Sequence, residues 1–284
     1  MERFCDLHTH SVFSDGTCTP AQIIDRAVAL GLSTVALTDH DSVDGLPEFL
    51  AAAQGQPVEA VAGGEFAVEY EGTELHLLGL FIPPAAFGRI AALMEQVHRR
   101  REQCVRDLVD SLNREGYGLD FAAMKAGAKG QVTRAHVAVA IEAQGRMDAQ
   151  TAFRTLLQPG AGHYQSPRRL AFLQVLDVLC QEGAVPVLAH PFLNMTQPQL
   201  EDFLPQAKQW GLAGMECIYS AYSDQQIQTS FTLANRFGLL PSGGSDFHGD
   251  LRKEAPLGNG NRPIPDHFAD DLKKGALSWQ ASLY

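Results

Sequence analysis

Cysteine is scarce in this sequence of 284 residues, and the few cysteines form no pattern. They stand at Cys5, Cys18, Cys104, Cys180 and Cys217, an odd number without any Cys-x-x-Cys pair. Such spacing excludes a disulfide framework and a zinc knuckle. We therefore expect reduced thiols and a cytoplasmic location.

Long apolar runs are absent as well. No stretch approaches the roughly 18 uninterrupted apolar residues of a spanning helix, and the first residues lack the apolar region of a signal peptide. We expect neither membrane insertion nor secretion. Hydrophobic residues still make up 45% of the chain, which supplies a sizeable core and excludes wholesale disorder.

Positive charge is also in short supply. Lys and Arg number 22 against 33 Asp and Glu, giving a formal net charge of −11. Binding along a nucleic-acid duplex depends largely on neutralising phosphates, so we expect no duplex partner. A small anionic ligand in a locally positive pocket stays compatible with this charge, because bound divalent cations can provide the positive field.

Strands alternate with helices over most of the chain. We expect strands at 4–7, 33–37, 58–62, 185–189, 214–218 and 239–242, and a hairpin at 66–81. Thr19, Pro20 and Gln22 predict a capped helix over 20–30, which Gly31 ends. About seven such units favour an α/β fold with a mostly parallel sheet, closed or nearly closed into a TIM-like (βα) barrel.

One segment interrupts the alternation. Residues 119–165 contain only short helices separated by glycines, at 132–143 and 149–157. We expect residues 1–118 and 166–284 to form the barrel and 119–165 to form a small helical cap insertion.

Histidine and carboxylate side chains follow five of the expected strands. In a barrel, chemistry is placed at the carboxyl ends of the strands. Side chains two apart on a strand share a side, so His8 and His10 form a pair, as do Asp246 and His248. Mixed imidazole and carboxylate sets suit divalent metals. The two oxygens of Glu65 make it a natural bridge between two metal ions.

The full series of motifs resembles the PHP (polymerase and histidinol phosphatase) family. It comprises His8-Thr9-His10-Ser11, Ser14-Asp15-Gly16, Thr38-Asp39-His40-Asp41, Gly64-Glu65, His76, His190-Pro191 and Gly244-Ser245-Asp246-Phe247-His248. The resemblance covers residues 1–82 and about 167–250. It implies a distorted (βα)7 barrel and a metal-dependent phosphoesterase.

The resemblance also implies two to three divalent ions, Mn first, with Zn, Fe or Mg as alternatives. Their ligands would be His8, His10, Glu65 and Asp246 for the first ion, Glu65, His76 and His190 for the second, and Asp15, His40 and His248 for the third. Catalytic roles fall to Glu65, Asp246 and His248. Asp39, Asp41 and Ser245 are candidates for outer contacts to these ligands.

The segment from 119 onward supplies candidate substrate contacts. Arginine forks suit phosphate, and we expect Arg134, His136 and Arg168 to bind substrate. The His98-Arg99-Arg100-Arg101 run is expected to be a solvated helix face.

A capped chain of this length is similar to the 3′,5′-nucleotide bisphosphate phosphatases. We therefore predict hydrolysis of the 3′-phosphate of nucleoside 3′,5′-bisphosphates, such as adenosine 3′,5′-bisphosphate to AMP, by a metal-bridging hydroxide. The alternative is a 5′-to-3′ exonuclease on short RNA or DNA oligonucleotides. A histidinol-phosphate-type phosphatase, a carbonyl hydrolase and a non-catalytic metal- or nucleotide-binding module stay open.

Overall fold

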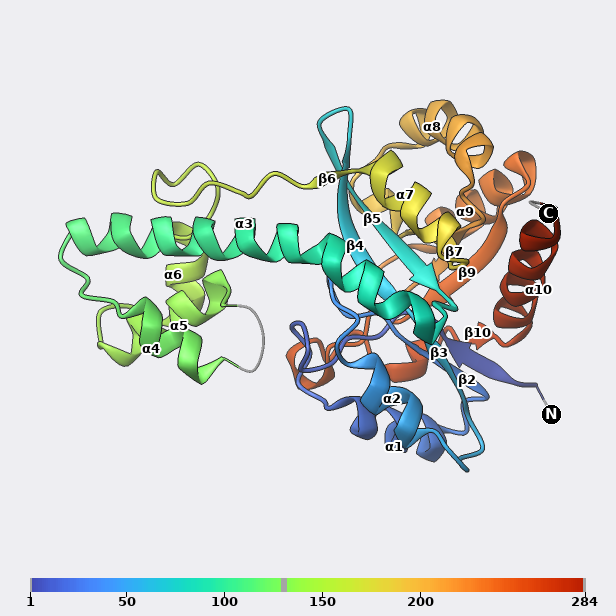
Figure 1. Cartoon of the computed structure of the whole chain (residues 1–284), viewed down its shortest axis with the longest axis horizontal. Coiled ribbons are helices and arrows are strands. Elements are labelled where there is room, and N and C mark those ends of the chain that lie inside the picture. Colours follow the sequence, from blue (N-terminus) through green and yellow to red (C-terminus); the bar gives the residue numbers. More distant parts are fainter. Residues whose placement is uncertain (1, 129–131, 283–284) are drawn as a thin grey trace. The chain divides into compact units, whose positions relative to one another are not determined.

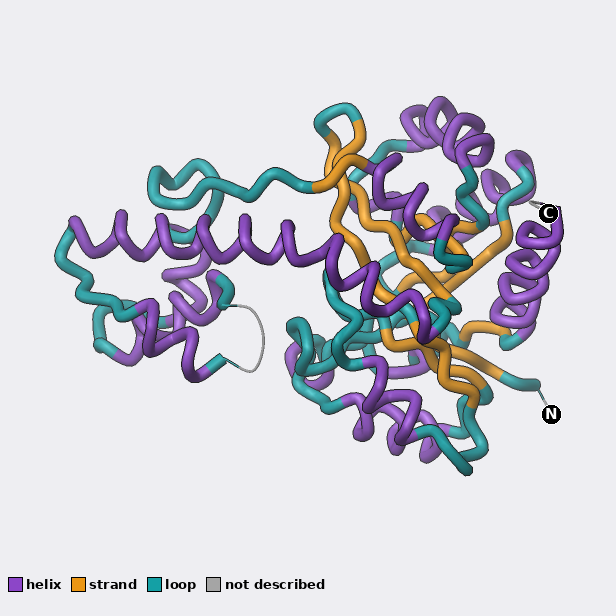
Figure 2. Tube along the Cα trace, in the orientation of Figure 1, coloured by secondary structure: helices purple, strands orange, loops and turns teal. Residues whose placement is uncertain are grey.

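The strands form two sheets in the computed structural model, which describes residues 2–128 and 132–282 (Figures 1 and 2). The first has the order β10 (Ile264–Pro265), β1 (Phe4–Asp6), β2 (Thr34–Leu37), β3 (Glu59–Ala62). The second has the order β6 (Leu170–Ala171), β4 (Gly64–Tyr70), β5 (Thr73–Leu80), β7 (Val185–Ala189), β8 (Gly214–Tyr219), β9 (Leu240–Gly244).

The expected α/β architecture is confirmed, but the expectation of a mostly parallel, closed barrel is not. Strand β5 is antiparallel to both neighbours, β4 and β7. The pairing of β4 with β5 has a local cause, because the two strands are joined at Glu71 and Gly72, which have φ of 48° and 79°. A tight turn of this kind forces antiparallel pairing. The resulting sheets are mixed, and the described strands do not close into one ring.

The two sheets nevertheless meet at the ends that carry the histidines. The Leu7 N–H donates to the Gly243 carbonyl at 3.2 Å, and Thr9 pairs with Phe247 in an isolated bridge. A second isolated bridge joins His40 to Glu65. These contacts bring the segments that follow β1, β2 and β9 together around the start of β4.

Helices cover the sheets in the larger of two compact units, Met1–Ala91 with Leu170–Tyr284. They are α1 (Pro20–Leu30), α2 (Leu46–Ala52), α7 (Phe172–Gln181), α8 (Gln197–Trp210), α9 (Asp224–Phe237) and α10 (His267–Ser282). The prediction for α1 is confirmed: Thr19 and Gln22 form a capping box, and Gly31 ends the helix at φ 70°. Buried side chains of the strands, Leu78 and Val187 among them, pack with Phe268 and Leu272 of α10.

The second compact unit is Ala92–Arg169. It contains most of α3 (Phe87–Arg114), followed by α4 (Phe121–Gly127), α5 (Arg134–Ala143) and α6 (Ala149–Thr155). Its core joins Val105, Leu108 and Leu112 of α3 to Val137 and Ile141 of α5. The spacing of the α3 residues is that of one helix face, which explains how a long charged helix anchors this unit.

Two further properties bear on the sequence analysis. All five cysteines are free thiols, and all but Cys104 are buried. Among the described helices, none combines the length and the apolar content that crossing a bilayer requires.

Candidate metal centre

His8 and His10 point to the same side of the chain, as their spacing predicts. Both imidazoles are fully buried, and their ring centroids lie 5.1 Å apart. The Nε2 atoms lie 3.2 and 3.3 Å from Oε2 of Glu65, and 3.6 and 3.1 Å from Oδ1 of Asp246. Two imidazoles and two carboxylates from three distant segments thus face one point.

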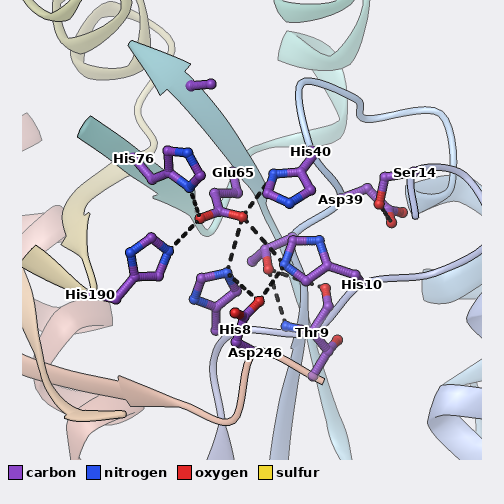
Figure 3. Close-up of polar contacts among 12 residues, drawn as sticks. His8, Thr9, His10, Ser14, Asp39, His40, Glu65, His76, His190 and Asp246 are labelled. Carbon is purple, nitrogen blue, oxygen red and sulfur yellow. Dashed lines mark hydrogen bonds and ion pairs between the residues drawn. The ribbon is translucent and has the colours of Figure 1, made fainter. Parts of the chain in front are cut away.

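Glu65 stands at the centre of the site (Figure 3). Its Oε1 lies 2.7 Å from Nδ1 of His76 and 2.9 Å from Nε2 of His190. Its Oε2 faces His8 and His10, and lies 2.9 Å from Nδ1 of His40. The carboxylate is fully buried at the beginning of β4, so its two oxygens serve two separate groups of imidazoles.

A third group lies on the outer side of His10. Asp15 Oδ1 is 3.2 Å from Nε2 of His248, and Asp15 Oδ2 is 3.8 Å from Nε2 of His40. The rings of His10 and His248 stack with centroids 4.2 Å apart. Asp15 is the most exposed of these ligands, with 48% of its side chain accessible, so this group faces solvent.

Several of these buried atoms have no hydrogen-bond partner among the described residues. They are His8 Nε2, His10 Nδ1, His10 Nε2, Glu65 Oε2 and His248 Nε2. Buried polar atoms without partners are costly and rare, and here they converge on each other. Divalent cations would satisfy them. Ligand atoms within 4.8 Å of one another form three sets: His8, His10, Glu65 and Asp246; His10, Asp15, His40 and His248; and His40, Glu65 and His76.

Hydrogen bonds on the far side of two rings leave the facing nitrogen free to bind a metal. His248 Nδ1 lies 2.8 Å from the backbone carbonyl of Asp246, which can only accept, so Nδ1 carries a proton. His8 Nδ1 lies 2.9 Å from Oε1 of Glu216 and donates in the same way. In the neutral ring, Nε2 then holds the lone pair, as a metal ligand requires.

The electrostatics of the cluster are those of a site built for positive charge. Burial by itself raises the pKa of Glu65, but the surrounding imidazoles outweigh it and hold the pKa well below its usual range. Burial likewise opposes charge on His10 and His76, yet the neighbouring carboxylates raise their pKa values to about 9 and about 10. In the absence of cations, protons would neutralise the carboxylates, and metal ions would compete with them.

Glu216 is a residue of the site that the sequence analysis missed. It lies fully buried on β8, where Oε1 accepts from His8 and Oε2 accepts from the backbone N–H of His190 at 2.6 Å. His190 has a φ of 25°, an unfavourable conformation for a side chain with a Cβ, which this bond helps to hold. A glutamate in the middle of the apolar run 214–219 was the signal in the sequence.

Tyr219 and Arg252 also contact the site and were not predicted. The Tyr219 hydroxyl donates to Oδ2 of Asp246 at 2.9 Å, and Arg252 Nη1 contacts the same oxygen. Asp246 therefore presents only Oδ1 to His8 and His10. Burial raises the pKa of the Tyr219 hydroxyl, and the Asp246 charge adds to this, so the phenol stays a donor.

The acidic residues beside His40 accept hydrogen bonds from neighbouring loops and from β4. Asp39 accepts from the N–H and the hydroxyl of Ser11, both at 2.7 Å, and from the hydroxyl of Ser14. Asp41 accepts from the N–H of Ala67 at 3.0 Å. Ser245 donates to Asp6, at the end of β1. These bonds fix the loops that carry the ligands.

The three residues predicted to contact the substrate lie in the second unit, and their side chains have different neighbours. Arg134 donates to the Leu157 carbonyl at 3.0 Å and lies over the rings of Phe153 and Tyr164. His136 accepts from the Thr133 N–H through Nδ1, and its Nε2 therefore carries the proton of the neutral ring. Arg168 lines a groove along α3. His136 lines a pocket between α4 and α5.

Comparison with known proteins agrees with this geometry. The family model described as the PHP domain matches residues 6–160. A 5′-3′ exoribonuclease of Haemophilus influenzae is 32% identical over 87% of this chain and 91% of its own length. A 3′,5′-nucleoside bisphosphate phosphatase of Chromobacterium violaceum is 32% identical over 86% of each chain. The crystal structure of a Bifidobacterium adolescentis protein, assigned as a metal-dependent phosphoesterase, superposes with a TM-score of 0.81 at 26% identity over 96% of each chain.

The chain therefore belongs to the PHP domain family. Together with the histidine and carboxylate clusters, these relatives place it among the metal-dependent phosphoesterases of that family.

Proposed function

We propose that this protein removes the 3′-phosphate from nucleoside 3′,5′-bisphosphates. The observation that carries the proposal is the convergence of unpartnered buried ligand atoms on Glu65, Asp246 and His248. The bisphosphate phosphatase of Chromobacterium violaceum supports this choice of substrate. The exoribonuclease of Haemophilus influenzae, equally similar and covered over 91% of its length, supports a second candidate, 5′-to-3′ hydrolysis of short oligonucleotides.

We propose two or three divalent ions in this site, with Mn²⁺ as the first expectation. His8, His10, Glu65 and Asp246 would hold the first ion, Glu65, His76 and His190 the second, and Asp15, His40 and His248 the third. When bound, such ions supply a water of lowered pKa and neutralise charge on phosphate oxygens.

The residues of the chain itself would keep this arrangement rigid. Glu216 fixes the His8 ring and the strained backbone of His190. Tyr219 and Arg252 turn Oδ1 of Asp246 toward the imidazoles. Positions held in this way need little rearrangement when the substrate binds, which favours catalysis by electrostatic preorganisation. We assign the catalytic roles to Glu65, Asp246 and His248.

We further propose that the second unit contributes the contact to the other phosphate of a bisphosphate. The 119–165 segment would act as the cap, with Arg134 and His136 inside it and Arg168 in the chain just after it as the contacts. His136 is suited to this because burial lowers its pKa and its neutral ring donates through Nε2. Arg134 has an additional structural task, since its guanidinium already contacts Phe153, Tyr164 and the Leu157 carbonyl.

The test is a phosphate-release screen of the Mn²⁺-loaded protein. Its substrates are adenosine 3′,5′-bisphosphate, adenosine 3′-monophosphate, histidinol phosphate and 5′-phosphorylated oligonucleotides. A charge-assisted second contact of about 1.5–3 kcal/mol predicts roughly ten- to over a hundred-fold higher kcat/KM for the bisphosphate than for the 3′-monophosphate.

Asp246→Asn is the control for this screen and should release no phosphate from any substrate. Equal rates on the bisphosphate and the 3′-monophosphate would overturn the phosphatase proposal. Fastest turnover of oligonucleotides, with mononucleotides released from the 5′ end, would establish the exonuclease in its place.

A further inference from the structure

A second candidate site lies in the unit Ala92–Arg169, apart from any metal ligand. A groove of about 610 Å³ runs along α3, between this helix and the chain around 162–168. Three arginines line it: Arg100 and Arg114 from α3, and Arg168 from the loop. Arg100 is half-buried, the other two are exposed, and Nη1 of Arg100 approaches the Arg168 carbonyl at 3.5 Å.

These three arginines differ from most others in the ion pairs they make. On the same helix, Arg99 pairs with Glu95 at 3.4 Å, and Arg106 pairs with Glu102 at 2.9 Å. Within the described residues, Arg100, Arg114 and Arg168 have no carboxylate within ion-pair distance. In a chain with 33 acidic and 22 basic residues, three unpaired arginines in one groove mark a local excess of positive charge.

The other polar residues that line the groove are compatible with an anionic ligand. Its one acidic lining residue, Asp107, accepts a hydrogen bond from Gln103 at 2.8 Å. Ser166 contributes a hydroxyl, which can donate to a phosphate oxygen. The lining contains no Phe, Tyr or Trp, and its one ring is the imidazole of His163, whose Nδ1 lies 3.1 Å from the Ser111 hydroxyl. The groove therefore offers mainly contacts to phosphate groups.

The length of the groove indicates which kind of anionic ligand fits it. Arg100 and Arg114 are fourteen positions apart on one helix, which corresponds to about 21 Å. A single nucleotide cannot span that distance, whereas a stacked single strand that rises about 3.4 Å per nucleotide covers it with roughly six nucleotides. Guanidinium forks contact phosphates in pairs of hydrogen bonds.

We infer that this groove binds the phosphate backbone of single-stranded nucleic acid. Binding is independent of base sequence, because contacts to phosphates carry no sequence information, and it depends strongly on salt. The inference deepens the second candidate function, 5′-to-3′ hydrolysis of short oligonucleotides, on which its biological meaning rests, by assigning a surface that holds the strand. The binding itself does not require that the protein hydrolyse the strand.

The experiment measures anisotropy of a 3′-fluorescein, phosphorothioate-linked RNA 12-mer added to the Mn²⁺-loaded protein at several salt concentrations. Three phosphate contacts predict a slope of about −2 for log K against log salt. The Arg100→Ala/Arg114→Ala double variant should bind about tenfold more weakly near 50 mM salt, with a slope nearer −0.7. Arg99→Ala, on the same helix and outside the groove, is the matched control and should bind like the parent.

The double variant should keep its helical circular dichroism, its melting temperature and its turnover of a mononucleotide. Parent-like affinity of a folded double variant overturns the inference. So does equally tight, equally arginine-dependent binding of poly-glutamate, which would assign the groove to an acidic peptide, or of AMP, which would assign it to a small anion. Strand binding without hydrolysis of any phosphate ester would leave this inference standing and overturn the proposed function instead.

Discussion

The His8 ring donates through Nδ1 to Oε1 of Glu216 at 2.9 Å, and both side chains are completely buried. The other oxygen of Glu216 accepts from the His190 backbone. One carboxylate that is not itself among the clustered ligands therefore orients two histidines from opposite sides of Glu65. In metal sites, such partners raise ligand basicity and fix the ring tautomer.

Replacing this carboxylate should weaken metal binding more than it weakens the fold. Glu216→Gln keeps the size of the side chain but removes the charge that accepts from His8, and metal affinity should fall about 10- to 100-fold. Titration with Mn²⁺ and elemental analysis after dialysis measure this. Glu59→Gln, at an exposed residue that pairs with Lys273, is the control and should bind metal as the parent does. Equal affinities in both variants would contradict the role of Glu216.

Gly244 lies where β9 passes against His8. A Cβ at this position would lie 2.1 Å from the His8 Cβ and 3.0 Å from Oε1 of Glu216. Gly244→Ala should therefore displace His8, lower metal occupancy and destabilise the fold by several kcal/mol, the size expected of severe overpacking. Gly88→Ala is the matched control, because its added Cβ meets nothing within 4 Å and it lies in a helix. Thermal unfolding and metal analysis compare the two, and parent-like occupancy in Gly244→Ala would refute the steric argument.

The stability of the metal-free protein should depend on pH through the same cluster. His10 and His76 have pKa values raised from 6.5 to about 9 and about 10, so their contribution is complete below pH 6.5 and is lost as pH rises through those values. Glu65 and Asp246 have lowered pKa values, so their contribution is present above the ordinary carboxyl range and is lost in acid. Chelator-treated protein should thus melt highest near pH 5–6.5.

Added metal ions should offset the loss of stability that the metal-free protein shows at alkaline pH. At pH 9 His10, with a pKa of about 9, is about half deprotonated, and His76, with a pKa of about 10, has begun to lose its proton. Mn²⁺ then replaces the lost positive charge between the carboxylates. We expect the melting temperature at pH 9 to rise more on adding Mn²⁺ than at pH 6, with protons released on binding. Calorimetry in buffers of different ionisation enthalpy counts those protons. A metal-free protein that gains stability between pH 6.5 and 9 would contradict the assignment.

We expect Arg134 to stabilise the fold as well as to contact the substrate. Removing its contacts to two rings and one carbonyl should lower the free energy of unfolding by about 1–3 kcal/mol. Arg154→Ala, at an exposed position of α6, should change it by less than about 0.5 kcal/mol. Arg168→Ala should reduce the preference for bisphosphates without the loss of stability. Denaturant unfolding measures the free energy of unfolding of all three variants. An Arg134→Ala variant as stable as the parent would show that Arg134 does not stabilise the fold.

Local features of the fold were predictable from the sequence because they depend on neighbouring residues. The α1 helix follows from Thr19, Gln22 and Gly31, and the β4–β5 hairpin follows from the turn at Glu71 and Gly72. The pairing of His8 with His10 follows from the two-residue period of an extended chain. The closed parallel barrel was not confirmed, since strand order and direction are set by pairing between distant segments.

The residues that surround the ligands were accessible only in three dimensions. Glu216 is 208 positions from His8, and Tyr219 is 27 positions from Asp246. Nothing near them in the chain marks their partners, apart from a charge within an apolar strand. The same holds for Arg100 and Arg168, which line one groove although 68 positions separate them.

The sequence by itself determined the kind of chemistry this protein can perform. The types of its ligands and their positions after strands are written in the chain, because ligand chemistry and strand periodicity are local properties. The tertiary structure decided how those ligands share Glu65, which acid orients them, and where unpaired positive charge collects. Those properties depend on distances and burial between segments far apart in sequence, and packing of the whole chain sets both.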